Sequence, residues 1–281
     1  MLVWFAMKDT FLHFLEAQWH RGKLLCLGLD SELAKIPSAV SGKDPFERIC
    51  TFNKAIIDST RDIVGTYKIN SAFYEAHGDV GLRALRETVS LIRGAAPNIP
   101  VILDAKRADI GNTNNGYVAF AFEYLGVDAI TVNPYLGREA LQPFLDRKEK
   151  GIIVLCRTSN RGGEEFQDLD AGGKPMYKIV AQHVAEEWNA NGNCGLVVGA
   201  TYPNEIAEVR KIVGDMPILI PGIGAQGGNL EKTIVAAKDA GGGGMIIHAA
   251  RSVIFASSDR DYADAARAEA EKLDGAIRSV L

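Results

Sequence analysis

About eight short apolar runs recur along the 281 residues, and most are followed by a stretch with helical spacing of its apolar residues. This alternation is typical of parallel α/β proteins, because each strand reaches the next through a crossover that a helix usually supplies. Eight strands are the number that closes a (β/α)8 TIM barrel. We expect the strands at 24–29, 64–69, 99–104, 127–132, 151–156, 194–199, 216–221 and 243–248.

The segments between these runs carry helix signals. Leu82, Leu85 and Val89 follow the spacing of one helix face, and Asp44-Pro45 suits an N-cap and first helical position. We expect an extra N-terminal helix around 8–21. Because no linker or break in composition interrupts the chain, a single domain over 1–281 is favoured over two.

An open, doubly wound sheet would alternate in the same way. Its Gly-x-Gly-x-x-Gly fingerprint does not follow the first expected strand, where Gly28-Leu29-Asp30 occurs instead. The barrel is therefore the favoured α/β architecture.

Composition narrows the class of protein. Hydrophobic residues make up 47% and charged residues 23% of the chain, as in soluble globular proteins. The net charge of −4 gives no general reason to bind nucleic acid or an anionic membrane. The apolar segment 1–7 ends at Lys8, too early for a signal peptide, and no later run has membrane-spanning length. We expect a reduced, cytoplasmic protein, since no paired spacing joins the cysteines Cys26, Cys50, Cys156 and Cys194.

Polar residues gather where the expected strands end. In a barrel such positions face the active site, whereas the same residue types elsewhere are normally solvated surface. They are Asp30, Lys68, Asp104, Lys106, Asn133, Thr158 and Ser159.

The sharpest cluster is Asp104-Ala-Lys106, because strand alternation places its two charged side chains on the same side. A structural salt bridge would explain an isolated pair. With Lys68 and Asp30 converging from other strands, four charges in one cavity are expensive unless a ligand uses them. Schiff-base chemistry needs a lysine of lowered pKa, but Asp104 and Asp109 flank Lys106. We therefore expect a protonated Lys106 that stabilises a carbanion and donates a proton to it.

Two glycine-rich segments complete the expected mouth of the barrel. Residues 221–228, followed by Arg251 after the last strand, have the position of the barrel phosphate site, with a helix start near Ala250; otherwise the glycines simply make turns. The polar segment 157–175 is long enough to suggest a mobile active-site loop.

The sequence offers little support for a metal site or for catalysis by a histidine. The five histidines show no ligand spacing, and His248 at a strand end is better read as a packed residue than as a general base. Cys26 and Cys156 lie inside apolar runs and are expected in the core. We expect no metal site.

Four motifs together, DAKRADIGNT, YKINSAFYEAHG, RTSN and PGIGAQGG, resemble those of the orotidine 5′-monophosphate decarboxylase family, in its longer, bacterial-type group. The resemblance runs through nearly all eight expected strands. It implies a barrel enzyme without a cofactor that works as a homodimer. Such an enzyme releases CO2 from orotidine 5′-monophosphate to give uridine 5′-monophosphate in pyrimidine biosynthesis.

The resemblance also implies roles for individual residues. Lys106 would protonate C6 of the pyrimidine and Asp104 would lie beside the departing carboxylate. Asp109, with Ile110 and Thr113, would reach into the partner subunit's site, so that the dimer shares its active sites. The remaining contacts would be Asp30 and Lys68 to the ribose, with Lys68 also holding the charge network, Ser159 to the pyrimidine, and Gln226 and Arg251 to the phosphate. One departure is Arg161-Gly162-Gly163, where the family commonly has a proline and small residues.

Two rival functions stay open. A related sugar-phosphate decarboxylase or hexulose-phosphate synthase shares the Asp-x-Lys-x-x-Asp strand end but uses Mg²⁺, which Lys68 would repel. A catalytically silent phosphate-binding or scaffold protein is the other, although such a protein could replace its buried charges with apolar residues at little cost.

Overall fold

The computed structural model describes residues 10–223 and 229–281 and shows a closed barrel of eight parallel strands in sequence order. Every strand expected from the sequence is present, which confirms the TIM barrel. Seven of them end within one residue of the expected position, whereas β3 runs three residues further, to Arg107. The strands are β1 (Leu25–Gly28), β2 (Thr66–Asn70), β3 (Val101–Arg107), β4 (Ala129–Val132), β5 (Gly151–Arg157), β6 (Cys194–Val198), β7 (Ile218–Ile220) and β8 (Met245–Ala249).

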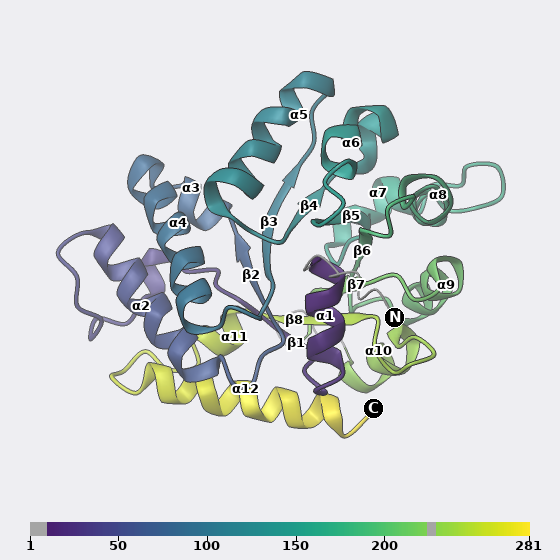
Figure 1. Cartoon of the computed structure of the whole chain (residues 1–281). Helices are drawn as coiled ribbons and strands as arrows, with labels where there is room; N and C mark the ends of the chain where they lie inside the picture. The colour runs from purple at the N-terminus through teal and green to yellow at the C-terminus, as the bar shows by residue number, and fades with distance from the viewer. Residues whose placement is uncertain (1–9, 224–228) are drawn as a thin grey trace, which may run out of the picture.

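Helices surround the strands, and α1 lies in front of them in the view of Figure 1. The α-helices are α1 (Phe11–Trp19), α2 (Pro45–Thr60), α3 (Ala72–Glu75), α4 (Gly78–Ala95), α5 (Gly111–Val118), α6 (Gly137–Leu145), α7 (Glu164–Gln167), α8 (Met176–His183), α9 (Pro203–Val213), α10 (Leu230–Ala237), α11 (Arg251–Ile254) and α12 (Tyr262–Arg278). Shorter or wider turns are η1 (Leu33–Lys35), η2 (Ala119–Leu125), η3 (Pro134–Leu136), η4 (Arg161–Gly163) and η5 (Val184–Trp188).

Local signals place two helices as expected. The Asp44 side chain accepts a hydrogen bond from the backbone N–H of Glu47 at 2.9 Å and caps α2, with Pro45 at the first helical position. In α4, Leu85, Val89 and Ile92 are buried on one face against the core. None of the helices that the structure describes is both long and apolar enough to span a membrane.

Helix α1 closes one end of the barrel. Phe11 and Leu15 are buried in a cluster with one interior residue from most strands, among them Cys26, Ile102 and Ile153. Phe11 lies so close to Gly151, the first residue of β5, that a Cβ there would come within 2.2 Å of the ring. The barrel interior at this end is therefore packed and apolar.

Two residues further along the same strands, the interior becomes polar. Ile102 is followed by Asp104, Ala129 by Thr131, and Ile246 by His248, because side chains alternate between the two faces of a strand. Gly28 belongs to the same level, where a Cβ would lie 2.6 Å from His248 Nε2. The absence of a side chain at this glycine makes room for the imidazole.

The connection 157–175 is more regular than expected. It contains the 3₁₀ turn η4 and the short helix α7, and an isolated antiparallel bridge joins Asp170 to Pro175. It follows β5 and leads into α8.

Candidate active site

A cavity of about 460 Å³ opens at the carboxyl ends of the strands. Its floor includes the apolar side chains of Leu155, Val197 and Leu219, directly above the packed interior. The residues expected at the site that line it are Asp30, Lys68, Asp104, Lys106, Thr158, Ser159 and Arg251. The barrel thus brings together in space residues that lie up to 221 positions apart in the sequence.

Asp104 joins two lysines in the middle of this cavity. Its Oδ2 accepts a hydrogen bond from Lys68 Nζ at 2.7 Å, and its Oδ1 accepts one from Lys106 Nζ at 2.6 Å. Asp30 Oδ1 lies 3.9 Å from Lys68 Nζ, on the other side of that ammonium group. Carboxylates and ammonium groups therefore alternate in a row from Asp30 to Lys106.

Mutual attraction keeps the inner members of this row charged. Burial alone would lower the pKa of Lys68, but the carboxylates of Asp104 and Asp30 raise it above its ordinary value. Burial likewise opposes ionisation of Asp104, yet Lys68 and Lys106 hold the pKa of its carboxyl well below the usual range. Asp104 is thus a poor proton acceptor at neutral pH.

Lys106 is the member that faces open space. Its side chain is 48% exposed, compared with 3% for that of Lys68. Regular strand alternation does not explain its position, because Leu103 to Arg107 pair with only Ile130 to Val132. Lys106 itself has φ of +47°, the one positive value at a non-glycine residue in the part of the chain that the structure describes. An irregular strand end therefore turns the ammonium group back onto Asp104.

Thr131 of β4 supports this strained turn, although no motif in the sequence pointed to it. Its hydroxyl donates to Asp104 Oδ1 and accepts from the backbone N–H of Lys106, both at 2.9 Å. Its place two residues after Ala129, on the inward face of an expected strand, was the signal that could have identified it.

His248 is buried beside the charged row, and its Nε2 has no hydrogen-bond partner among the described residues. Burial, and then the nearby charge of Lys68, lower its pKa well below the ordinary value. The imidazole is therefore neutral at physiological pH, in agreement with its interpretation as a packed residue.

Asp109 does not lie beside Lys106 in the cavity of its own chain. Its carboxylate accepts a hydrogen bond from the backbone N–H of Ile110 at 2.7 Å. The buried amide of Asn114 holds this turn in place by bonding both backbone groups of Asp109, at 2.9 Å and 2.6 Å. Ile110 is 63% exposed and Thr113 is also exposed, and neither of them lines the cavity.

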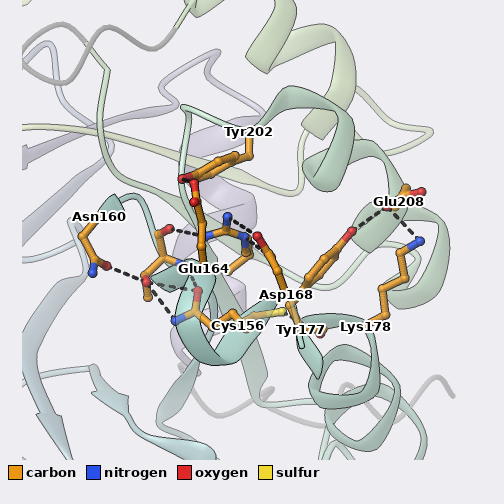
Figure 2. Close-up of polar contacts among 11 residues, drawn as sticks. Cys156, Asn160, Glu164, Asp168, Tyr177, Lys178, Tyr202 and Glu208 are labelled. Carbon is orange, nitrogen blue, oxygen red and sulfur yellow. Dashed lines mark hydrogen bonds and ion pairs between the residues drawn. The ribbon is translucent and has the colours of Figure 1, made fainter. Parts of the chain in front are cut away.

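The segment after β5 forms one wall of the cavity. Ser159 packs against the end of β6, where a Cβ on Gly199 would lie 2.6 Å from Ser159 Cα. Gln167 bonds Thr158 twice, accepting from its N–H at 2.8 Å and donating to its hydroxyl at 2.9 Å. Figure 2 shows the polar contacts within this segment and the one from Tyr202 of the β6–α9 connection to Glu164, together with the contacts of Tyr177 and Lys178 in α8 with Glu208 in α9.

The expected phosphate site is only partly described. Arg251 is exposed and lines the cavity at the start of α11, while Gln226 lies outside the described residues. The helix start expected near Ala250 is present, because α11 begins at Arg251 with Ala250 as its N-cap. Helix α11 has only four residues, too few peptide dipoles for a strong field, so Arg251 is the main source of positive charge here.

Cys26 and Cys156 are buried, as expected, and burial raises the pKa of the Cys156 thiol to about 12. Between residues 10 and 223 and from 229 onward, no three His, Cys, Asp or Glu side chains are grouped so that they could hold a metal ion.

The charged row lies within a segment that matches a known family. The model of the orotidine 5′-phosphate decarboxylase / HUMPS family matches residues 23–266, most of the chain. The chain belongs to this family. It is 50% identical over 276 residues to an orotidine 5′-phosphate decarboxylase from Janthinobacterium sp. (strain Marseille), an alignment that covers 97% of this chain and 99% of that relative.

Solved structures of the family have the same fold. An OMP decarboxylase from Leishmania donovani is 36% identical, with a TM-score of 0.84, and the match covers 96% of this chain and 98% of that one. A UMP synthase from the same organism is 37% identical, with a TM-score of 0.86; here the match covers 97% of this chain but 57% of the longer one.

Proposed function

We propose that this family member is a carboxy-lyase that converts orotidine 5′-monophosphate to uridine 5′-monophosphate and CO2, with Lys106 protonating a carbanion at C6. The names of the close relatives support the overall reaction. The observation that carries the mechanism is the charged row, in which Asp104 holds an exposed Lys106 ammonium at the cavity.

In this mechanism the bond between C6 and the carboxylate breaks, and its electron pair stays on C6. The Lys106 ammonium faces that charge, and one of its protons moves to C6 to complete the product. Lys106 then regains a proton from water, which its exposed side chain can reach. Because Asp104 stays ionised, it anchors the ammonium group and does not compete for the proton.

The remaining site residues bind the rest of the nucleotide. We assign the ribose to Asp30 and Lys68, the pyrimidine to Ser159, and the phosphate to Arg251 together with Gln226. The position of Arg251 at the cavity supports its assignment to the phosphate, since a guanidinium forms paired hydrogen bonds with phosphate oxygens.

The reaction needs no metal or other cofactor in this proposal. Lys68 occupies the place on β2 where a Mg²⁺-dependent lyase would need a carboxylate, and it contributes a second positive charge beside Lys106. A divalent cation between them would be repelled. This argument disfavours the magnesium-dependent rival.

We further propose a homodimer with shared active sites. Asp109, Ile110 and Thr113 do not line the cavity of their own chain, and Ile110 and Thr113 are exposed, so this segment is available to complete a partner's site. A cytoplasmic location is also proposed, supported by four cysteines that form no disulfide.

The direct test is turnover of orotidine 5′-monophosphate by purified protein in the presence of a chelator, followed by nucleotide chromatography and CO2 release. We expect stoichiometric uridine 5′-monophosphate and CO2 with and without the chelator. No turnover in either condition would reject the function, and would leave the silent phosphate-binding protein as the better reading. Turnover that the chelator abolishes would reject only the metal-free mechanism.

Replacing Lys106 tests its role. Lys106→Ala should lower kcat by about 10³-fold or more, because it removes both the proton donor and the charge facing C6. Uridine 5′-monophosphate should still bind in titration calorimetry. Lys148→Ala, which removes an exposed lysine after α6, is the matched control and should leave kcat unchanged. A Lys106→Ala enzyme of near wild-type kcat would remove lysine from the mechanism.

A further inference from the structure

A buried arginine stands at the end of β5, outside the charged row. Arg157 is 1% exposed and is the last residue of the strand, where the pairing of β5 with β6 shifts register. A guanidinium in such a place needs partners, because an uncompensated buried charge is strongly destabilising. Its partners come from two other segments.

The first partner is Asp168, which follows α7. Arg157 Nη2 donates to Asp168 Oδ2 at 2.9 Å, and Nε lies 2.9 Å from Oδ1 without hydrogen-bond alignment. The second partner is Tyr202, the residue before α9, whose ring centroid lies 3.8 Å from the guanidinium carbon. We call Arg157, Asp168 and Tyr202 the Arg157 cluster.

A further contact brings α7 into the cluster. Tyr202 Oη donates to Glu164 Oε1 at 3.2 Å, so the tyrosine holds the first residue of α7, while Arg157 holds Asp168, the residue after the last one of this helix (Figure 2). The position of Gly163, just before α7, leaves no room for a side chain, since a Cβ there would lie 3.0 Å from Arg157 Nη1 and 2.8 Å from Gln167 Oε1. Helix α7 is thus fixed at both ends by groups that belong to the barrel.

Two residues of α7, Phe166 and Gln167, line the cavity. Phe166 lines the cavity although the residue is 66% exposed, so its own packing does not hold it there. Gln167 bonds Thr158, the neighbour of Ser159, through its amide. The position of α7 therefore decides where both Phe166 and Ser159 lie.

We propose that Arg157 is a positioning residue for the decarboxylation. Through Asp168 and Tyr202 it holds α7 at the cavity mouth, so that Ser159 and Phe166 are in place before the nucleotide enters. This inference rests on the proposed function. The cluster contacts no reacting atom. It raises the fraction of free enzyme molecules in which the cavity wall is already assembled.

A positioning role and a purely structural role predict different kinetics. If the wall is assembled in only a fraction of the molecules, the apparent affinity for the nucleotide falls by that fraction, while the saturated enzyme still turns over normally. A merely structural loss would lower the amount of folded protein and leave KM unchanged.

Asp168→Asn is the variant of choice, because Asp168 is 41% exposed at its side chain and the change keeps its shape. We expect KM for orotidine 5′-monophosphate to rise about 10-fold with kcat within twofold. In the free enzyme, amide hydrogen exchange should accelerate in 158–170 and stay at wild-type rates in β5 and β6. Glu165→Gln removes the same charge from an exposed side chain of the same helix and should match wild type in both measurements.

Two further variants separate the contributions. Asp168→Glu keeps the charge and should recover part of the lost KM. Tyr202→Phe keeps the ring and should affect KM less than Tyr202→Leu, which removes the surface that the guanidinium stacks on.

An Asp168→Asn enzyme with the KM and exchange rates of Glu165→Gln overturns the proposal, and so does exchange that accelerates throughout the barrel. If the wild-type enzyme converts the nucleotide, such a result concerns the Arg157 cluster alone. If the wild-type enzyme does not, the proposed function falls, and the exchange measurement in the free protein still decides the positioning role.

Discussion

Asp104, Thr131 and His248 each lie two residues beyond an apolar residue that fills the barrel interior, and at that level the chemistry of the site is assembled. Asp104 stabilises the folded protein while it is ionised. Since its pKa is lowered on folding, this contribution is present above about pH 4 and is lost as the pH falls further. Lys68 has a raised pKa, so its contribution is present below about pH 10 and is lost above. Between these limits the row keeps its charges.

His248 should make stability depend on pH between these limits. In the unfolded chain it takes up a proton below about pH 6.5, whereas the folded state keeps it neutral. The unfolded state then binds more protons, so the free energy of unfolding should fall by about 1.4 kcal/mol for each pH unit below that value. Urea unfolding at pH 5, 6 and 7 should show this slope in wild type.

His248→Asn should lose that part of the slope, because asparagine does not titrate. The matched control is His20→Asn, which replaces an exposed histidine and should keep the wild-type slope. An unchanged slope in His248→Asn would mean that the imidazole is protonated in the folded protein.

At the scale of the elements, the site depends on where strands stop being regular. β3 continues through Lys106 with a register shift against β4, and β5 shifts against β6 before Arg157. These irregular ends direct polar side chains that a regular strand would place elsewhere. The connections that follow then pack against neighbouring strand ends, and glycines allow the closest approaches.

Gly199→Ala tests such an approach, because its Cβ would lie 2.6 Å from Ser159 Cα and must displace that backbone. We expect KM for orotidine 5′-monophosphate to rise by about 10-fold, with a loss of roughly 1–3 kcal/mol in the free energy of unfolding from overpacking. Enzyme kinetics and urea unfolding measure the two effects.

Gly94→Ala introduces the same methyl group in α4, where no atom lies within 4 Å of the added Cβ. It should leave KM unchanged and stabilise the protein by about 0.5–1 kcal/mol, because alanine is the better helix former. A Gly199→Ala enzyme with wild-type KM would show that Ser159 is not needed at its observed position.

At the scale of the whole molecule, barrel closure collects the site from nearly all strands, yet leaves Asp109 outside its own cavity. The proposed dimer predicts complementation between two inactive variants. Mixing Lys106→Ala with Asp109→Ala subunits should restore roughly a quarter of wild-type activity, because about half of the dimers are mixed and each has one intact site of two.

The measurement requires dissociation and reassociation of the subunits, with mixed dimers confirmed by native mass spectrometry. Each variant carried through the same steps alone is the control and should stay inactive. Mixed dimers without activity would place Asp109 in its own subunit's chemistry or in none.

Short-range patterns in the sequence determined the eight strands, the cap of α2, the core cysteines and the presence of Asp30, Lys68, Asp104 and Lys106 at one end of the barrel. These features depend on the pleat of a strand and the burial of apolar residues, which act between neighbours along the chain. The family resemblance rested on the same local motifs.

Only the tertiary structure decided how those residues meet. The left-handed backbone at Lys106, the support from Thr131 and the partners of Arg157 depend on register between strands and on packing across connections. Arg157 was visible as a charge ending an apolar run, but its partners lie 11 and 45 residues further along. Contacts over such separations are set by barrel closure, because closure brings the strand ends to one rim. The residues that become neighbours there decide which partners each buried charge has.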